Sequence, residues 1–348
     1  MSPTISVLFR AIPLLMGAVC LSFGLYVLSG GDDAGHFVAG HVLIALTAIC
    51  VALFTTAATI IRQLIHRYGP VWVILLPTLG YAVSLATIIW GVTIIASGGE
   101  LKLQVAGHVV LGIGFIAACV STVATASTTF VLIQKAQTQP VGSPAPQGAY
   151  SRGVGSVLVA IPAVLAAIGI VLAITLFVRG GNLGLVAGHV LLGLSLICAA
   201  LVALVASIVR QVRNEFGDAE RFWWTWWVVA MGTVNVVLGL VVLLGSDNPS
   251  RLAPGTVLIG LGLICFSIMS KVVLLALVWR RTFALANRIP LIPVGTALAC
   301  LFFSAFLFEA TADQSGFFVG AHVLVGLGAV CFTLFSIVSI LEAGTAKE

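Results

Sequence analysis

Charged side chains are scarce in this sequence, and their scarcity excludes a water-soluble domain. Only 8% of the 348 residues are charged, whereas 60% are hydrophobic and the mean hydropathy is +1.20. A soluble domain carries roughly 25% charged residues because its surface faces water. The net charge is only +5, and the basic residues do not form the contiguous footprint that binds nucleic acid. We therefore expect a protein solvated by lipid, with no nucleic-acid partner.

Cysteine motifs are also lacking, although seven cysteines are present. All seven fall inside apolar runs, and none belongs to a CxxC pair. This pattern excludes a disulfide framework and a zinc knuckle, because buried Cys behaves as a small hydrophobic residue. The chain also has no GxSxG, HExxH or phosphate-binding glycine loop, and no paired buried carboxylates. We expect neither an enzyme nor a bound cofactor or metal.

Long apolar runs fill most of the chain. A helix needs about 20 apolar residues to cross the ~30 Å hydrocarbon core of a bilayer. Ten such runs occur, near residues 7–28, 37–61, 71–96, 104–133, 154–177, 184–209, 223–245, 253–279, 290–309 and 317–341. The first run has no A-x-A-like cleavage site, so we expect an uncleaved span rather than a signal peptide. The prediction is an all-α, polytopic membrane protein with ten transmembrane helices.

The interruptions between the runs divide the chain into hairpins. The longest break, residues 134–153, is rich in Pro, Gly, Ser and Gln, which is typical of a flexible linker. We assign the linker to residues 136–153 of a single membrane domain that covers residues 1–348. Within this domain we expect five helical hairpins, at residues 1–66, 67–135, 154–213, 222–281 and 288–342.

The basic residues predict the topology. Three lie on one side of the predicted spans: Lys102, Arg179 and Arg251. Twelve lie on the side of the termini: Arg10, Arg62, Arg67, Lys135, Arg152, Arg210, Arg213, Arg221, Arg280, Arg281, Arg288 and Lys347. Because cytoplasmic loops carry an excess of Lys and Arg, we expect both termini and the linker in the cytoplasm.

A repeated motif marks the second span of each hairpin. The copies are VAGHVLIALTAIC (38–50), VAGHVVLGIGFIA (105–117), VAGHVLLGLSLIC (186–198), APGTVLIGLGLIC (253–265) and VGAHVLVGLGAVC (319–331), at intervals of 67, 81, 67 and 66 residues. The hairpins therefore repeat in the same orientation, and parallel repeats are related by an axis along the membrane normal. A ring with approximate five-fold symmetry is the simplest closed arrangement. An open row or a 2+3 split would satisfy the sequence equally well.

The equivalent positions of the motif are the first candidates for a functional site: His41, His108, His189, Thr256 and His322. Ionisable residues in a membrane usually face the bundle interior or a water-filled cavity, and His changes charge between about pH 5 and 8. A small residue follows four positions later, about 40° round the helix. If this face points to a central axis, the imidazoles form a pH-sensing, pore-lining ring at the outer mouth. Two alternatives stay open: the histidines hold neighbouring hairpins together, or two of them bind haem iron.

Lys271 is the second candidate, because it is a basic residue deep inside a span. The equivalent positions in the other hairpins are Thr56, Val123, Leu204 and Ile337. A lone intramembrane charge indicates a functional site. Alternatively, the long side chain extends towards the cytoplasmic surface, nine residues away.

Three segments carry a family resemblance: SRLAPG (250–255), LVWRRTFALANRIPLIPV (277–294) and VLVGLGAVCFTLFSIVSILEAGTAKE (323–348). They resemble the bacterial YhiM-type inner-membrane proteins, and the similarity extends along the chain to the AGHV motifs and the Pro-rich linker. The resemblance implies a ten-span inner-membrane protein of undefined biochemical activity that is linked to survival at low pH. It implies no catalytic or binding residues.

We therefore expect an inner-membrane pore or transporter for a small ion or solute that responds to external acid and contributes to low-pH survival. Its partners would be membrane lipid and the transported species. Two other functions fit the sequence: a haem- or metal-binding membrane protein, and a non-transporting scaffold or stress factor with structural histidines. The transported species, its direction and the oligomeric state are left open.

Overall fold

A computed structural model describes residues 3–137, 139–140, 142–245, 248–279, 288–311 and 316–345. Three of the basic residues used to predict the topology, Arg280, Arg281 and Lys347, lie outside the described residues. Within the described part of the chain every regular element is helical, and ten helices are long and apolar enough to cross a membrane. The predicted all-α class and the ten spans are confirmed.

The first two pairs of long helices precede the linker. They are α1 (Pro3–Ser29) with α2 (Ala34–Leu64), and α3 (Pro70–Ala96) with α4 (Leu101–Ala126). A 3-10 turn, η1 (Ser127–Thr129), and a short helix, α5 (Phe130–Gln137), prolong α4. The turn between α1 and α2 is stabilised by Asp33, whose carboxylate caps α2 by accepting the backbone N–H of Gly35 at 2.7 Å.

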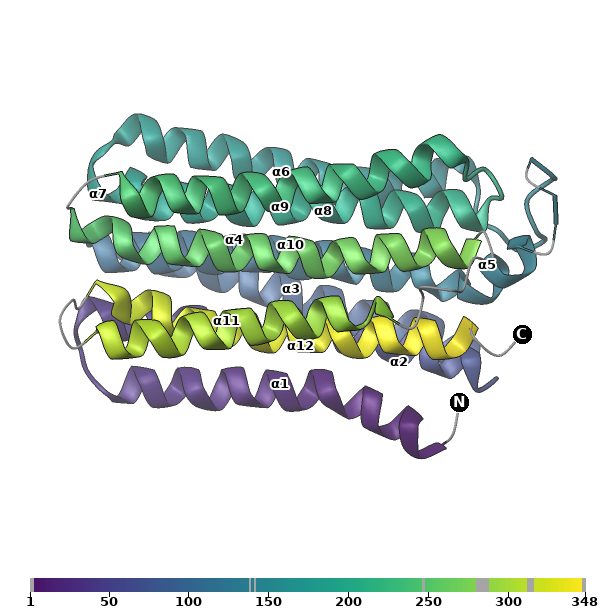
Figure 1. The fold of residues 1–348 in the computed structure, drawn as a ribbon, viewed down its shortest axis with the longest axis horizontal. Coiled ribbons are helices and arrows are strands. Elements are labelled where there is room, and N and C mark those ends of the chain that lie inside the picture. The colour runs from purple at the N-terminus through teal and green to yellow at the C-terminus, as the bar shows by residue number, and fades with distance from the viewer. Residues whose placement is uncertain are drawn as a thin grey trace.

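The remaining pairs follow the linker. The third pair is α6 (Arg152–Arg179) and α8 (His189–Val212), joined by α7 (Gly181–Leu183) and a π-helical turn, η2 (Gly184–Gly188). The fourth is α9 (Asp218–Leu244) and α10 (Leu252–Trp279), separated by the 3-10 turn η3 (Pro249–Arg251). The fifth is α11 (Leu291–Ala310) and α12 (Phe317–Thr345). The long helices run side by side, and α1 begins and α12 ends at the same end of the molecule, called here the terminal end (Figure 1).

The ten long helices form two layers. In the apolar windows of α2, α4, α8, α10 and α12, 67–94% of the residues are buried, against 28–33% in α1, α3, α6, α9 and α11. The second helix of each pair is therefore an inner helix, and the first is an outer helix. Large apolar side chains of the outer helices are exposed, including Ile74 at 71% and Val171 at 59%. Lipid must solvate these side chains.

The inner helices contact one another in the order of the chain. α2 packs against α4, α4 against α8, α8 against α10, α10 against α12, and α12 against α2. Each outer helix packs on the inner helix of its own pair and on one further inner helix; α3, for example, contacts both α4 and α2. Every inner helix is therefore covered on its lipid side and packs against two other inner helices.

The predicted linker is attached to the end of α8. Described residues 139–140 and 142–151 contain no helix. The Asn214 side-chain amide donates to the carbonyl oxygen of Pro140 at 2.9 Å, and Arg213 donates to that of Tyr150 at 2.9 Å. Tyr150 also packs against the apolar core, a contribution that the composition of the linker does not indicate.

Candidate functional site between the inner helices

A narrow cavity lies between the five inner helices. Its free volume is about 20 Å³, and among the described residues that line it only Lys271 has a charged or polar side chain. A cavity needs roughly 10–15 Å³ measured in this way to hold one water molecule. The space between the inner helices is therefore almost completely filled by apolar side chains.

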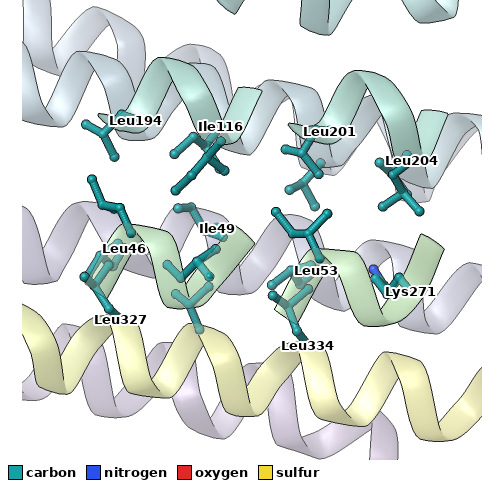
Figure 2. Close-up of a pocket in the computed structure, with 17 residues that line it drawn as sticks. Leu46, Ile49, Leu53, Ile116, Leu194, Leu201, Leu204, Lys271, Leu327 and Leu334 are labelled. Atoms are coloured by element: carbon teal, nitrogen blue, oxygen red, sulfur yellow. The ribbon is translucent and has the colours of Figure 1, made fainter. Parts of the chain in front are cut away.

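The lining side chains form successive layers along the helices. Layer 1 consists of Leu46, Leu194, Leu261 and Leu327; layer 2 of Ile49, Ile116, Ile197, Ile264 and Val330; layer 3 of Leu53, Val120, Leu201, Ile268 and Leu334; and layer 4 begins with Val123, Leu204 and Lys271. Figure 2 shows the labelled members in this order, from Leu46 and Leu327 at one end to Leu204 and Lys271 at the other. Layers 1 to 3 close the space between the inner helices.

The spacing of the lining residues explains why they share one face. Along α8 they are Leu194, Ile197, Leu201 and Leu204, at alternating steps of three and four residues. This 3.5-residue period keeps one stripe of side chains directed at the partner helices. Layers 1 to 4 lie 5, 8, 12 and 15 residues after the His or Thr of the repeated motif. Every copy of the motif is followed by this period, which the sequence-based prediction did not include.

A second cavity of about 20 Å³ adjoins the first on the side of the terminal end. Layer 4 is completed here by Thr56 and Ile337, and the two cavities share Val123, Leu204 and Lys271. Layer 5 follows, with Ile60, Ser127, Ile208, Leu275 and Leu341. Phe130 and Ile133 of α5 also line this cavity and are 3% and 2% exposed. The helix that prolongs α4 thus adds two large apolar side chains beyond layer 5.

Lys271 lies where the two cavities meet. Its side chain is only 3% exposed, so it does not extend to the membrane surface as the snorkelling alternative requires. Among the described residues, no side chain or carbonyl forms a hydrogen bond or an ion pair with its Nζ atom. The other members of layer 4 are uncharged. Lys271 lies within α10, far from both ends of this helix, and its surroundings are the cavities between the inner helices.

The repeated histidines are bonded to their own helices. The imidazole Nδ1 donates to the carbonyl oxygen four residues earlier: His41 to Phe37 at 2.8 Å, His108 to Gln104 at 2.6 Å, His189 to Leu185 at 2.8 Å and His322 to Phe318 at 2.8 Å. Thr256 makes the equivalent bond, because its hydroxyl donates to the carbonyl oxygen of Leu252 at 2.8 Å. A carbonyl only accepts, so Nδ1 carries the hydrogen in all four imidazoles.

Three of the imidazoles contact aromatic rings of the outer helices. The ring of His189 lies 4.8 Å from Phe177 of α6, and that of His41 lies 5.5 Å from Trp90 of α3. His322 lies 4.7 Å from Phe308 of α11 and 5.4 Å from Phe23 of α1. None of the four histidines lines either cavity. The structure therefore places His41, His189 and His322 between inner and outer helices, and the pH-sensing role stays a prediction.

The small residues that follow the histidines lie at contacts between inner helices. A Cβ atom added at Gly193 would lie 2.5 Å from Leu258 Cδ2, and one added at Gly326 would lie 2.5 Å from Leu46 Cδ1. At Gly112 and Gly260 an added Cβ atom would likewise lie against leucine side chains of the next inner helix. This face was expected to point at a central axis if the histidines formed a ring. It receives the side chains of a neighbouring helix instead.

Residues that could bind a metal do not converge in the described part of the structure. No group of three or more His, Cys, Asp or Glu side chains lies close enough there to hold an ion. The seven cysteines are free and buried. Gln63 and Gln211, which are 4% and 0% exposed and bridge inner helices, were not among the predicted site residues. The shared Arg-Gln pairs at 62–63 and 210–211 could have revealed them.

Comparisons with known proteins cover almost the whole chain. A family model described as "Protein of unknown function (DUF2776)" matches residues 1–346. The inner membrane protein YhiM of Escherichia coli (strain K12) is 52% identical over 344 residues, which are 98% of each chain. No solved structure matches the chain.

Proposed function

Because the chain belongs to the DUF2776 family and is a multi-span inner membrane protein, and because the family description assigns no activity, we propose its function from the geometry of the inner helices. The protein is an inner-membrane pore for a small ion or solute, and it is closed in this conformation. The observation that carries the proposal is the set of apolar layers between all five inner helices. Hydrophobic constrictions of this kind close pores by excluding water.

The pore is built from five hairpins with approximate five-fold symmetry. Two observations support this arrangement. The contacts between inner helices proceed from α2 to α12 and return to α2. Each layer also takes its side chains from equivalent positions of the repeated motif. Similar interfaces that repeat with a constant rotation close into a ring. The central line of this ring, which passes through layers 1 to 5, is here called the axis.

The terminal end faces the cytoplasm in this proposal. The described basic residues support the orientation. Arg62, Arg210 and Arg213 lie in or just after the last turns of α2 and α8, at the terminal end, whereas Lys102, Arg179 and Arg251 lie beside the turns at the other end. An excess of Lys and Arg marks cytoplasmic loops. Layer 1 then lies nearer the outside, and Lys271 lies on the cytoplasmic side of layers 1 to 3.

The gating test introduces a hydroxyl into layer 3. Leu201→Ser should admit water to the axis, so vesicles that contain the full-length variant should release trapped salt faster than wild-type vesicles. The matched control is Leu240→Ser, because Leu240 is 43% exposed on the lipid face of α9. Release by Leu201→Ser but not by Leu240→Ser supports the pore. Folded Leu201→Ser protein that releases salt no faster than wild type contradicts it and favours the non-transporting scaffold.

A further inference from the structure

Lys271 places an amino group between two cavities whose other described lining residues carry no charge. We infer that its ammonium group, between the two axial cavities, binds a small monovalent inorganic anion of halide or nitrate size. This inference rests on the proposed pore and names the class of ion that the pore passes. The site is built, since the Lys271 side chain is 97% buried and lines both cavities.

In its protonated form Lys271 has no charged partner in its layer. The other four members of layer 4 are Thr56, Val123, Leu204 and Ile337, and none of them ionises. The ion pairs of the described residues join other groups, at the ends of the helices. An ammonium without a counter-charge in apolar surroundings is strongly destabilising. A bound anion removes that cost, whereas a cation would increase it.

The dimensions of the site limit the anion. Each adjoining cavity has a free volume of about 20 Å³, which is enough for roughly one water molecule. A halide ion is similar in size to water, and nitrate is slightly larger. Gluconate and phospholipid headgroups are much larger than either cavity. Thr56 and Ser127 also line the cavity on the terminal side. The Thr56 hydroxyl donates to the carbonyl oxygen of Ala52 at 3.2 Å, so the hydroxyl of Ser127 supplies the additional donor on this side.

The single-chain construction explains why only one charge is present. A pore assembled from five identical chains would repeat Lys271 five times around the axis. Here the hairpins are covalently joined, so one of the five equivalent positions can differ from the others. One lysine provides one anion site without repulsion between neighbouring ammonium groups. Charged side chains at a constriction select ions of opposite sign.

Anion binding can be measured without transport. Thermal unfolding of the purified full-length protein is compared in sodium bromide, nitrate and gluconate at equal ionic strength. A ligand that binds the folded state raises the Tm, and we expect bromide and nitrate to raise it by about 2 °C relative to gluconate. Lys271→Met should abolish this difference in Tm. Lys102→Met is the control, because Lys102 lies at the start of α4, at the end of the molecule away from the terminal end, and it should keep the difference. A Lys271→Met protein that keeps the full difference overturns the inference.

Ion selectivity is measured in the gate variant. Vesicles with Leu201→Ser should pass chloride in preference to potassium, and adding Lys271→Met should reduce this preference about tenfold, because a unit charge next to the path is lost. An unchanged preference overturns the anion site but leaves the pore intact. An absence of flux in the gate variant overturns the pore. Bromide stabilisation that depends on Lys271 would then still support the anion site.

Discussion

The side-chain amide of Gln63 donates a hydrogen bond of 2.7 Å to the backbone carbonyl of Ser127, 64 residues further along the chain. Gln211 makes the equivalent bond to the carbonyl of Leu275 at 3.1 Å, again across 64 residues. Each glutamine lies 22 residues after the histidine of its hairpin, and each acceptor belongs to layer 5. The two bonds therefore join α2 to α4 and α8 to α10 near the terminal end.

Removing the Gln63 amide should weaken this junction. Gln63 also accepts the N–H of Val131 in α5 at 3.2 Å, so Gln63→Ala loses two interhelical bonds. Interhelical hydrogen bonds in membranes contribute about 0.6 kcal/mol each. We expect a loss of about 1 kcal/mol in thermal unfolding in detergent. The control is Gln147→Ala, at an exposed position in the linker. Equal stability of the two variants would contradict the role of Gln63.

The ten helices could be predicted from the sequence, but the direction in which each face points could not. The spans are long apolar runs, and length with hydropathy is sufficient to place them. An inner helix such as α4 is buried on almost every side, since 94% of its most apolar segment is buried. Apolar side chains therefore occur all round it, and its sequence does not distinguish the face towards the axis from the faces towards neighbouring helices. His41 and its equivalents suggested the axial face because they are polar. Their Nδ1 groups are instead bonded within the helix, which removes the need for a polar cavity.

Lys271 could be singled out from the sequence because it is the charged residue deepest in a span. Its surroundings could not be predicted, because they depend on which five helices are adjacent. Residues from α2, α4, α8, α10 and α12 meet around it, and the contact between α12 and α2 joins segments almost 300 residues apart. The repeats suggested a closed arrangement, but an open row fitted them equally well.

Close contact within a hairpin should make Gly91 intolerant of a side chain. A Cβ atom at Gly91 would lie 2.6 Å from the backbone nitrogen of Leu111 and 2.9 Å from the carbonyl oxygen of Gly107. The two helix backbones would have to separate, so Gly91→Ala should lower the unfolding free energy by about 1–3 kcal/mol. Gly295→Ala is the matched control, because no atom lies within 4 Å of its Cβ position. If chemical denaturation shows that Gly295→Ala is less stable than Gly91→Ala, the close contact at Gly91 is refuted.

The histidines should behave as packing residues. His322 touches the rings of Phe23, Phe308 and Phe318, so His322→Ala should cost about 2–4 kcal/mol by leaving a cavity. His322→Phe keeps a ring and should cost less than half as much. Replacing His41, His108, His189 and His322 together by Phe should leave the pH dependence of salt release through Leu201→Ser unchanged. If that dependence disappears, the acid-sensing role is correct and the packing role is insufficient.

Glu215 should make the attachment of the linker sensitive to acid. The hydrogen bond from Arg213 lowers the pKa of Glu215 below its ordinary value of 4.5, aided by the charges of Arg210 and Arg152 and opposed by partial burial. A carboxyl group with a lowered pKa stabilises the fold above its ordinary pKa, and this contribution is lost as the pH falls through the lowered value. Stability should therefore decrease as the pH is lowered below about 4.5.

The measurement for Glu215 is thermal unfolding between pH 3 and 7. Glu215→Gln should be about 1 kcal/mol less stable than wild type at pH 7, and the gap should close towards pH 3. Glu100→Gln serves as a control, because the Glu100 side chain is 67% exposed at the opposite end. A gap for Glu215→Gln that persists at pH 3 would show that its charge is not responsible.

The central claim is that five equivalent positions face one axis, and layer 3 tests it most directly. Serine is introduced singly at Leu53, Val120, Leu201, Ile268 and Leu334, and currents are recorded across planar bilayers that contain each full-length variant. The account predicts that all five variants conduct and that their ion selectivity is the same, because each hydroxyl enters the same constriction. Conduction by none of the five folded variants, or by one alone, would contradict a shared axis.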